Sequence, residues 1–129
     1  MHHAWLLTGP RGIGKASFAR AAATRLLAEA AGPPIDDPGL DTPAHHPTAH
    51  LIAAGSHPDY RLIERIENKS GTALQRNISV EQIRDLGNLF AVTPAMSDWR
   101  AVVIDAADDL EASAANALLK MLEEPPAKC

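Results

Sequence analysis

The sequence predicts an α/β fold in which a parallel sheet is sandwiched between flanking helices. Short apolar runs that are typical of buried strands alternate along the chain with longer segments of helical periodicity. The 129 residues can form one compact domain with a real core. A helix is stopped by prolines close to the last residue, so we expect a truncated domain over residues 1–129.

The first third of the chain predicts a strand, a helix and a loop. Residues 4–8 form an apolar run ended by glycine and proline, which favours a buried strand. Residues 15–31 are rich in alanine and repeat apolar side chains every fourth position, which predicts a helix. Residues 32–47 carry several prolines and show neither periodicity. We therefore expect a loop or a degenerate insertion over residues 32–55.

The remaining chain predicts two strands and two helices. The strands are expected at residues 60–65 and 100–104, the latter ending on Asp105. Ser79 and Gln82 have the spacing of a capping box, which predicts a helix from there to about Phe90. The last helix has a stripe of core-facing residues and is stopped by Pro125; the stripe consists of Ala114, Leu118 and Leu122.

Composition excludes several classes of function. A net charge of −4 argues against a chain that binds nucleic acid unaided, because phosphate contacts require clustered lysine and arginine. The single cysteine, Cys129, provides neither a disulfide framework nor a thiolate zinc site. No apolar run has the length of a membrane span. We expect a cytoplasmic protein.

A glycine-rich motif follows the first predicted strand and matches a phosphate-binding P-loop. In such a loop, backbone N–H groups point inward at phosphate and the lysine reaches the outer phosphates. A glycine turn that only joins a strand to a helix is the alternative, and the four matched features in a strand-to-helix context favour the P-loop. The candidate nucleotide-binding residues are Gly9, Pro10, Arg11, Gly12, Ile13, Gly14 and Lys15.

Two alanines replace groups that a P-loop ATPase needs for turnover. Ala16 occupies the position of the serine or threonine that ligates magnesium. The neighbouring Ser17 is a poor substitute, because one residue rotates a helical side chain by about 100°. Asp105 could help to hold a metal, whereas Ala106 cannot orient or activate water as glutamate would there. We expect no catalytic residue and no hydrolysis, although weak ATP binding could persist.

The predicted loop contains three histidines and an aspartate that could suggest a metal site. The residues are Asp41, His45, His46 and His50, and their spacing matches no closed zinc site. The setting favours a solvated loop, so we expect no metal. The acids Asp108, Asp109 and Glu111 are interpreted as favourable charges near the start of the last helix rather than as catalytic groups.

Three segments of the chain resemble the clamp-loader subunits of bacterial DNA polymerase III, which belong to the AAA+ family. They are residues 3–15 (HAWLLTGPRGIGK), residues 54–60 (AGSHPDY) and residues 115–126 (ANALLKMLEEPP). The last segment is close to a family signature. The resemblance spans nearly the whole chain and implies a partial AAA+ P-loop domain.

The resemblance implies a subunit of the DNA-directed DNA polymerase holoenzyme. The family contains the ATP-hydrolysing gamma and tau subunits and a delta-prime subunit that often lacks hydrolysis. Ala16 and Ala106 make the chain similar to the delta-prime kind. The implied partners are the gamma or tau and delta subunits, and, through the assembled ring, the sliding clamp and primed DNA. Family members commonly carry four zinc-binding cysteines that this chain lacks, so no zinc is expected.

Two other functions compete with a non-hydrolysing assembly subunit. An active clamp-loader ATPase of the gamma or tau kind would need another residue to bind magnesium and another base. A small P-loop kinase would explain the glycine loop but not residues 115–126. The family places an arginine motif, which serves a neighbouring ATP site, beyond the position of Cys129. The sequence of that region would help to distinguish these functions.

Overall fold

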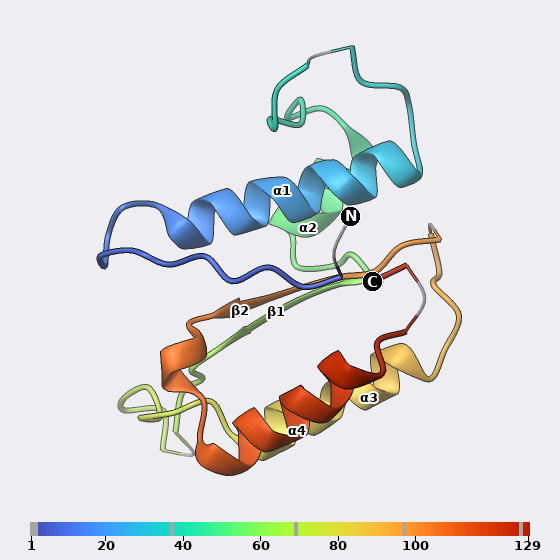
Figure 1. Ribbon diagram of the computed structural model, residues 1–129. Helices are drawn as coiled ribbons and strands as arrows, with labels where there is room; N and C mark the ends of the chain where they lie inside the picture. Colours follow the sequence, from blue (N-terminus) through green and yellow to red (C-terminus); the bar gives the residue numbers. More distant parts are fainter. Residues whose placement is uncertain (1–2, 37, 69, 97, 127) are drawn as a thin grey trace. The chain divides into compact units, whose positions relative to one another are not determined.

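The computed structural model describes residues 3–36, 38–68, 70–96, 98–126 and 128–129. The helices and strands follow one another in the order α1, α2, β1, α3, β2, η1 and α4 (Figure 1). Their bounds are α1 Lys15–Ala30, α2 Pro47–Ala53, β1 Tyr60–Glu64, α3 Val80–Phe90, β2 Ala101–Asp105, the 3₁₀ helix η1 Ala107–Asp109, and α4 Ala112–Glu123. None of the described helices is long and apolar enough to cross a membrane.

The chain divides into two compact units. The first comprises residues 1–61, 94–103 and 127–129 and contains α1 and α2. The second comprises residues 62–93 and 104–126 and contains α3, η1 and α4. Strands β1 and β2 pair in a small parallel sheet. The predicted α/β class is therefore confirmed, as are the predicted strands at residues 60–65 and 100–104.

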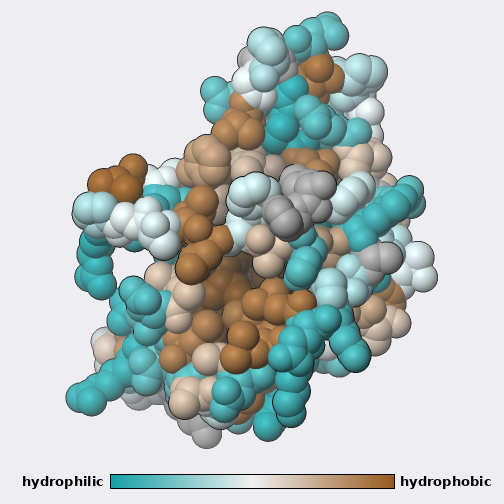
Figure 2. Space-filling view, in the orientation of Figure 1, coloured by the Kyte–Doolittle hydropathy of each residue, from teal (hydrophilic) through white to brown (hydrophobic). Residues whose placement is uncertain are grey.

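The strand predicted at residues 4–8 is wrong. The sheet of the described residues has two strands, and residues 4–8 belong to neither. Trp5 is 70% exposed and Leu6 is 76% exposed, and Figure 2 shows further hydrophobic residues at the surface. A short apolar run indicates a buried strand only where neighbouring strands pair with it and other elements cover it. Those neighbours cannot be read from the run itself.

The loop predicted over residues 32–55 is interrupted by α2. Helix α2 starts with Pro47, whose fixed φ suits the first helical position. The preceding His46 caps the helix, because its Nδ1 accepts a hydrogen bond of 3.2 Å from the Thr48 amide. Histidine is not among the residues that usually signal a helix start, so this helix was not predicted.

A buried arginine attaches the loop before α2 to α1. The Arg25 side chain is 9% exposed, and its Nε lies 2.7 Å from Glu29 Oε1, one turn further along α1. Its Nη1 also donates a 2.8 Å hydrogen bond to the carbonyl oxygen of Asp41. One guanidinium therefore bonds both its own helix and the loop, which a planar group with several donors can do.

Helix α3 begins with the predicted capping box. Ser79 Oγ accepts from the Gln82 amide at 3.3 Å, and Gln82 Oε1 accepts from the Ser79 amide at 3.0 Å. The helix packs against α4 and buries a stripe consisting of Ile83, Leu86 and Leu89. The helix ends at Phe90, as predicted, and Phe90 is half-buried. In α4 only Ala114 of the predicted stripe is fully buried.

Substituting the capping serine tests the contribution of the box. Ser79→Ala is expected to lower the free energy of unfolding by about 1 kcal/mol, because the Gln82 amide loses its acceptor. Urea denaturation would measure the loss. Ser113→Ala, at an exposed position within α4, is the matched control and should change stability by no more than a few tenths of a kcal/mol. Equal effects of the two changes would contradict a capping role.

The segment before α4 is joined to the start of α3 by backbone hydrogen bonds. The Ile78 amide donates to the Asp109 carbonyl at 2.7 Å, and the Glu111 amide donates to the Ile78 carbonyl at 3.1 Å. Asp109 Oδ2 lies 3.6 Å from Arg65 Nε. Asp108 and Asp109 belong to η1, and Glu111 is the N-cap residue of α4 without a capping bond from its side chain.

Candidate phosphate-binding loop

Residues 9–14 form a tight loop that leads into α1. Its three glycines have positive φ angles of 147° at Gly9, 87° at Gly12 and 97° at Gly14. Side-chain-bearing residues rarely adopt these angles, whereas glycine does so without steric cost. Gly14 is also the N-cap residue of α1. The glycine spacing of the motif is therefore what lets the chain turn directly into the helix.

Steric space around the glycines is a weaker constraint than their backbone angles. A Cβ atom at Gly9 would lie 2.5 Å from Ile13 Cδ1, which is closer than such atoms approach in real structures. A Cβ atom at Gly12 or Gly14 would meet nothing within 4 Å. The Ile13 side chain is 62% exposed and can rotate away, so at all three positions it is the backbone angle that requires glycine.

The N-terminus of α1 has the properties of an anion-binding end. Its N-cap residue provides no side-chain hydrogen bond, and its first turn contains no acidic residue. The Phe18 amide donates to the Gly14 carbonyl at 2.9 Å, so the amides before Phe18 precede the helical hydrogen-bond ladder. These donors and the positive end of the helix dipole favour a negatively charged group.

Lys15 folds back over the loop that precedes it. Its Nζ donates a hydrogen bond to the carbonyl oxygen of Gly9, at the start of the loop. An ammonium group has three donors, so this bond leaves capacity for phosphate oxygens. The contact keeps the positive charge beside the loop amides instead of letting the side chain extend into solvent.

The loop does not provide the magnesium ligand of an ATPase P-loop. Ala16 is half-buried in the first turn of α1 and presents a methyl group. Ser17, the next residue, is exposed. A hard divalent cation needs oxygen ligands, and position 16 offers none from its side chain. The residues present here fit a phosphate group and do not fit the metal that usually accompanies it.

Asp105 and Ala106 lie at the end of β2 in the second unit. Both are half-buried, and Asp105 is the last residue of the strand, as the sequence predicted. The carbonyl oxygen of Ala106 accepts from the Asp109 amide at 3.0 Å, which closes η1. The methyl side chain of Ala106 can neither accept a proton nor orient water.

The histidines of the predicted loop have different environments. His46 is 3% exposed, and both ring nitrogens have partners, since Nε2 lies 3.0 Å from the Pro33 carbonyl oxygen. His45 and His50 are exposed. Within the described ranges, no group of three or more histidine, cysteine, aspartate or glutamate side chains could hold a metal ion. His46 acts in helix capping, a role that the sequence did not indicate.

A buried carboxylate that the sequence left without a role holds the segment after α3. Asp59 is 2% exposed, and its two oxygens accept hydrogen bonds of 2.8 Å each from the amides of Ala95 and Met96. Its carbonyl oxygen accepts from the Ala101 amide at 3.0 Å, at the start of β2. An aspartate directly after His57 and Pro58 in a turn was the available signal, but its distant partners could not be inferred.

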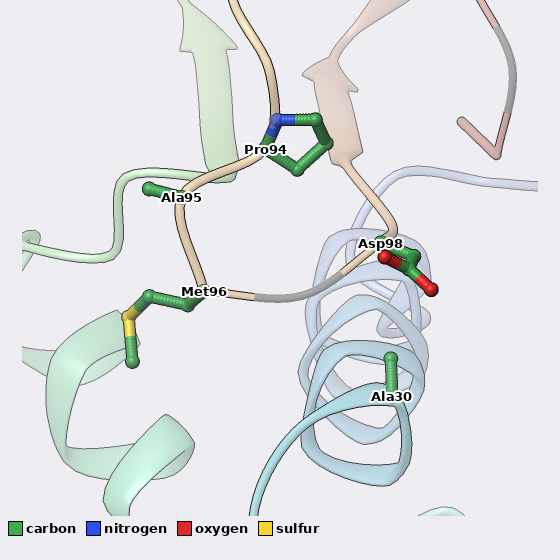
Figure 3. A pocket seen from close by; sticks show the side chains of 5 residues that line it. All are labelled: Ala30, Pro94, Ala95, Met96 and Asp98. Atoms are coloured by element: carbon green, nitrogen blue, oxygen red, sulfur yellow. The ribbon is translucent and has the colours of Figure 1, made fainter.

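The segment held by Asp59 lines a shallow hollow at the end of α1. Figure 3 shows the side chains that line the hollow, which are Ala30, Pro94, Ala95, Met96 and Asp98. Met96 is 45% exposed. The hollow is open to solvent, and Asp98 is the one charged residue among these five. It therefore lacks the enclosure and the converging polar groups that are typical of a ligand site.

Comparisons with known proteins point to one family. A family model described as "DNA polymerase III, delta subunit" matches residues 1–129. The chain is 37% identical over 126 residues to DNA polymerase III subunit delta' of Pseudomonas aeruginosa, which covers 95% of this chain and 34% of the relative. It is 34% identical over 125 residues to subunit delta' of Haemophilus influenzae, covering 96% of this chain and 34% of the relative.

A relative of another kind is almost as similar. Subunit tau of Bacillus subtilis is 35% identical over 127 residues, covering 98% of this chain and 20% of the relative. The chain thus spans about a third or less of the length of these relatives. Because the family model covers all of the residues, the chain belongs to the family of DNA polymerase III clamp-loader subunits.

Proposed function

We propose that the chain is part of a delta-prime-type subunit that helps to assemble the clamp-loader ring and does not hydrolyse ATP. The ring would place the sliding clamp on primed DNA during replication. The observation that carries this proposal is Ala16, half-buried at the position where a P-loop ATPase has its magnesium-binding hydroxyl. The similarity to two delta' subunits supports it.

The absence of turnover follows from the chemistry of phosphoryl transfer. This reaction depends on placing the nucleophile and on stabilising charge in the transition state, and magnesium does much of the latter. The side chain of Ala16 gives the metal no ligand, and that of Ala106 gives the attacking water no base. The metal ligand and the base are both missing, which favours a subunit that does not hydrolyse ATP.

Nucleotide binding can persist without turnover. The positive φ angles of the loop glycines and the uncapped start of α1 suit a phosphate group, and Lys15 lies beside them. We propose weak ATP binding at residues 9–15. The partners would be the gamma or tau and delta subunits. Contact with the clamp and DNA would be shared with them, in keeping with the net charge of −4.

An ATPase assay on the full-length protein with primed DNA tests the proposal. We expect phosphate release at the background level, and Lys15→Ala should not lower it further. Magnesium-dependent release that disappears in the Lys15→Ala variant would instead identify a gamma- or tau-type motor. The similarity to subunit tau of Bacillus subtilis supports this second candidate function.

A binding measurement tests the loop separately from hydrolysis. The affinity for ATP should be the same with magnesium and with a chelator, because position 16 provides no metal ligand. Lys15→Ala should weaken binding at least about tenfold through loss of a charge-assisted hydrogen bond. Ala16→Thr restores the hydroxyl and should make binding magnesium-dependent. A wild-type affinity that already falls without magnesium would show that another residue holds the metal.

A further inference from the structure

Two exposed apolar side chains flank Lys15 in the sequence of the phosphate-binding loop and α1. Ile13 is 62% exposed and Phe18 is 51% exposed. Phe18 is the one aromatic residue of α1, whose other apolar residues are alanine and leucine. The site therefore combines a cation and backbone amides with exposed apolar surface. Binding of a phosphate group alone would not need that surface.

Helical geometry places the Phe18 side chain beside Lys15. Residues three apart on a helix are neighbours, with Cβ atoms about 5–6 Å apart. The Phe18 amide donates to the Gly14 carbonyl at 2.9 Å, so Phe18 lies one helical turn, about 5.4 Å, beyond the end of the loop. Cα–Cβ bonds in a helix are tilted toward its N-terminus, so a side chain covers the preceding turn. The Phe18 side chain therefore extends toward the loop.

The space beside the start of α1 is open. A Cβ atom at Gly14, four residues before Phe18, would meet no atom of the described residues within 4 Å, its chain neighbours apart. The same holds for a Cβ atom at Gly12. Glycine at these positions thus leaves room for a bound group between the loop and the Phe18 side chain.

The part of the sequence that carries the site contains no acidic residue. Residues 1–28 include Arg11, Lys15, Arg20 and Arg25 but neither aspartate nor glutamate, although the whole chain has a net charge of −4. This local excess of positive charge favours an anionic ligand. It does not distinguish a nucleotide from an inorganic polyphosphate, because both carry the same kind of charge.

We propose that Phe18 stacks against the base of a nucleotide whose phosphates lie in residues 9–15. This role presupposes the weak ATP binding proposed for that loop. A nucleotide has an anionic end, which suits the loop amides and Lys15, and a flat base, which suits an aromatic ring. The ribose and the phosphates together can span the single helical turn between them. Phe18 is then the residue that makes the site prefer a nucleotide to an inorganic polyphosphate.

Binding of ATP and of inorganic tripolyphosphate to the full-length protein tests this role. Both affinities are measured with a chelator, so that metal has no part in the comparison. We expect wild type to bind ATP at least about fivefold more tightly, because stacking of a base on an aromatic side chain contributes that much or more. Phe18→Leu should remove most of this preference and leave the affinity for tripolyphosphate unchanged. Phe18→Tyr, which retains the aromatic ring, should keep the preference.

The Phe18 variants should fold. The buried residues of α1 are Ala23, Arg25, Leu27 and Ala28, which lie in its second half, and leucine favours a helix. Leu40→Ala is the matched control, because Leu40 is also a large apolar residue of the first unit and is 44% exposed. This control should leave both affinities unchanged.

A Lys15→Ala variant separates the role of Phe18 from the proposal for the loop. It should weaken the binding of ATP and of tripolyphosphate by a similar factor. If tripolyphosphate binding depends on Lys15 but ATP has no advantage, or if Phe18→Leu keeps that advantage, the role of Phe18 is wrong and the phosphate loop is still supported. If wild type binds neither ligand, or if Lys15→Ala changes neither affinity, nucleotide binding by the loop is itself wrong.

Nuclear magnetic resonance gives a second measurement that is independent of affinity. The H2 and H8 resonances of bound adenine should shift upfield in wild type and in Phe18→Tyr, because they lie over an aromatic ring, and should not shift in this way in Phe18→Leu. Nuclear Overhauser effects should connect these protons to the Phe18 ring. Bound ATP that shows neither effect in wild type would overturn the role of Phe18.

Discussion

Replacing Asp59 by alanine is expected to lower the free energy of unfolding by about 3 kcal/mol or more. The carboxylate is 2% exposed and accepts two backbone hydrogen bonds of 2.8 Å. Hydrogen bonds to charged groups contribute about 1.5 to 3 kcal/mol each, and buried amides that lose their acceptor add a desolvation cost. Alanine would leave the Ala95 and Met96 amides without this acceptor. Urea denaturation of the full-length protein would measure the loss.

Two matched variants separate the hydrogen bonds from the loss of charge. Asp59→Asn retains one acceptor oxygen and should have an intermediate effect. Asp98→Ala removes a carboxylate whose side chain is 81% exposed and whose partner is Lys128 at 3.3 Å. This exposed pair should contribute no more than about 1 kcal/mol. If Asp59→Ala were as mild as Asp98→Ala, the proposed support of residues 95–96 would be wrong.

The second large effect is expected in the second unit, where Ile83→Ala should cost about 2 to 5 kcal/mol. Ile83 is fully buried in α3, which packs against α4. Truncation removes buried methyl and methylene groups and leaves a cavity that the surrounding side chains fill only partly. Thermal and urea denaturation of the full-length protein would both report the loss of stability.

A graded series tests the packing explanation. Ile83→Val removes a single methylene and should cost about 0.5 to 1.5 kcal/mol. Val92→Ala, at a side chain that is 58% exposed just beyond α3, should have an effect within about 0.5 kcal/mol. A valine variant as unstable as the alanine variant would indicate a backbone effect instead of a cavity.

The elements predicted from local signals agree with the structure. The capping box at Ser79 fixed the start of α3 to within a residue, because the box is made of residues three apart. The glycine spacing of residues 9–14 likewise predicted a tight turn into α1, because each of these glycines has a positive φ angle that other residues rarely adopt. Both signals are complete within a few residues.

The failures concern features that depend on distant residues. Residues 4–8 have the composition of a buried strand, but burial depends on neighbours that their sequence does not encode. Helix α2 was missed because its cap is an imidazole, and Asp59 because its partners are 36 and 37 residues away. At the candidate site, the missing hydroxyl of Ala16 was visible in the sequence. The bond between Lys15 and the Gly9 carbonyl was not.

The distance along the chain between Asp59 and its partners also has a kinetic meaning. The two bonds can form only after the chain between Asp59 and its partners, which are 36 and 37 residues further along, has closed into a loop. The entropy of this closure must be offset before the bonds contribute to stability. We expect contacts between such distant residues to form after the transition state of folding. Asp59 should therefore act mainly on how slowly the folded chain opens, and little on how quickly it folds.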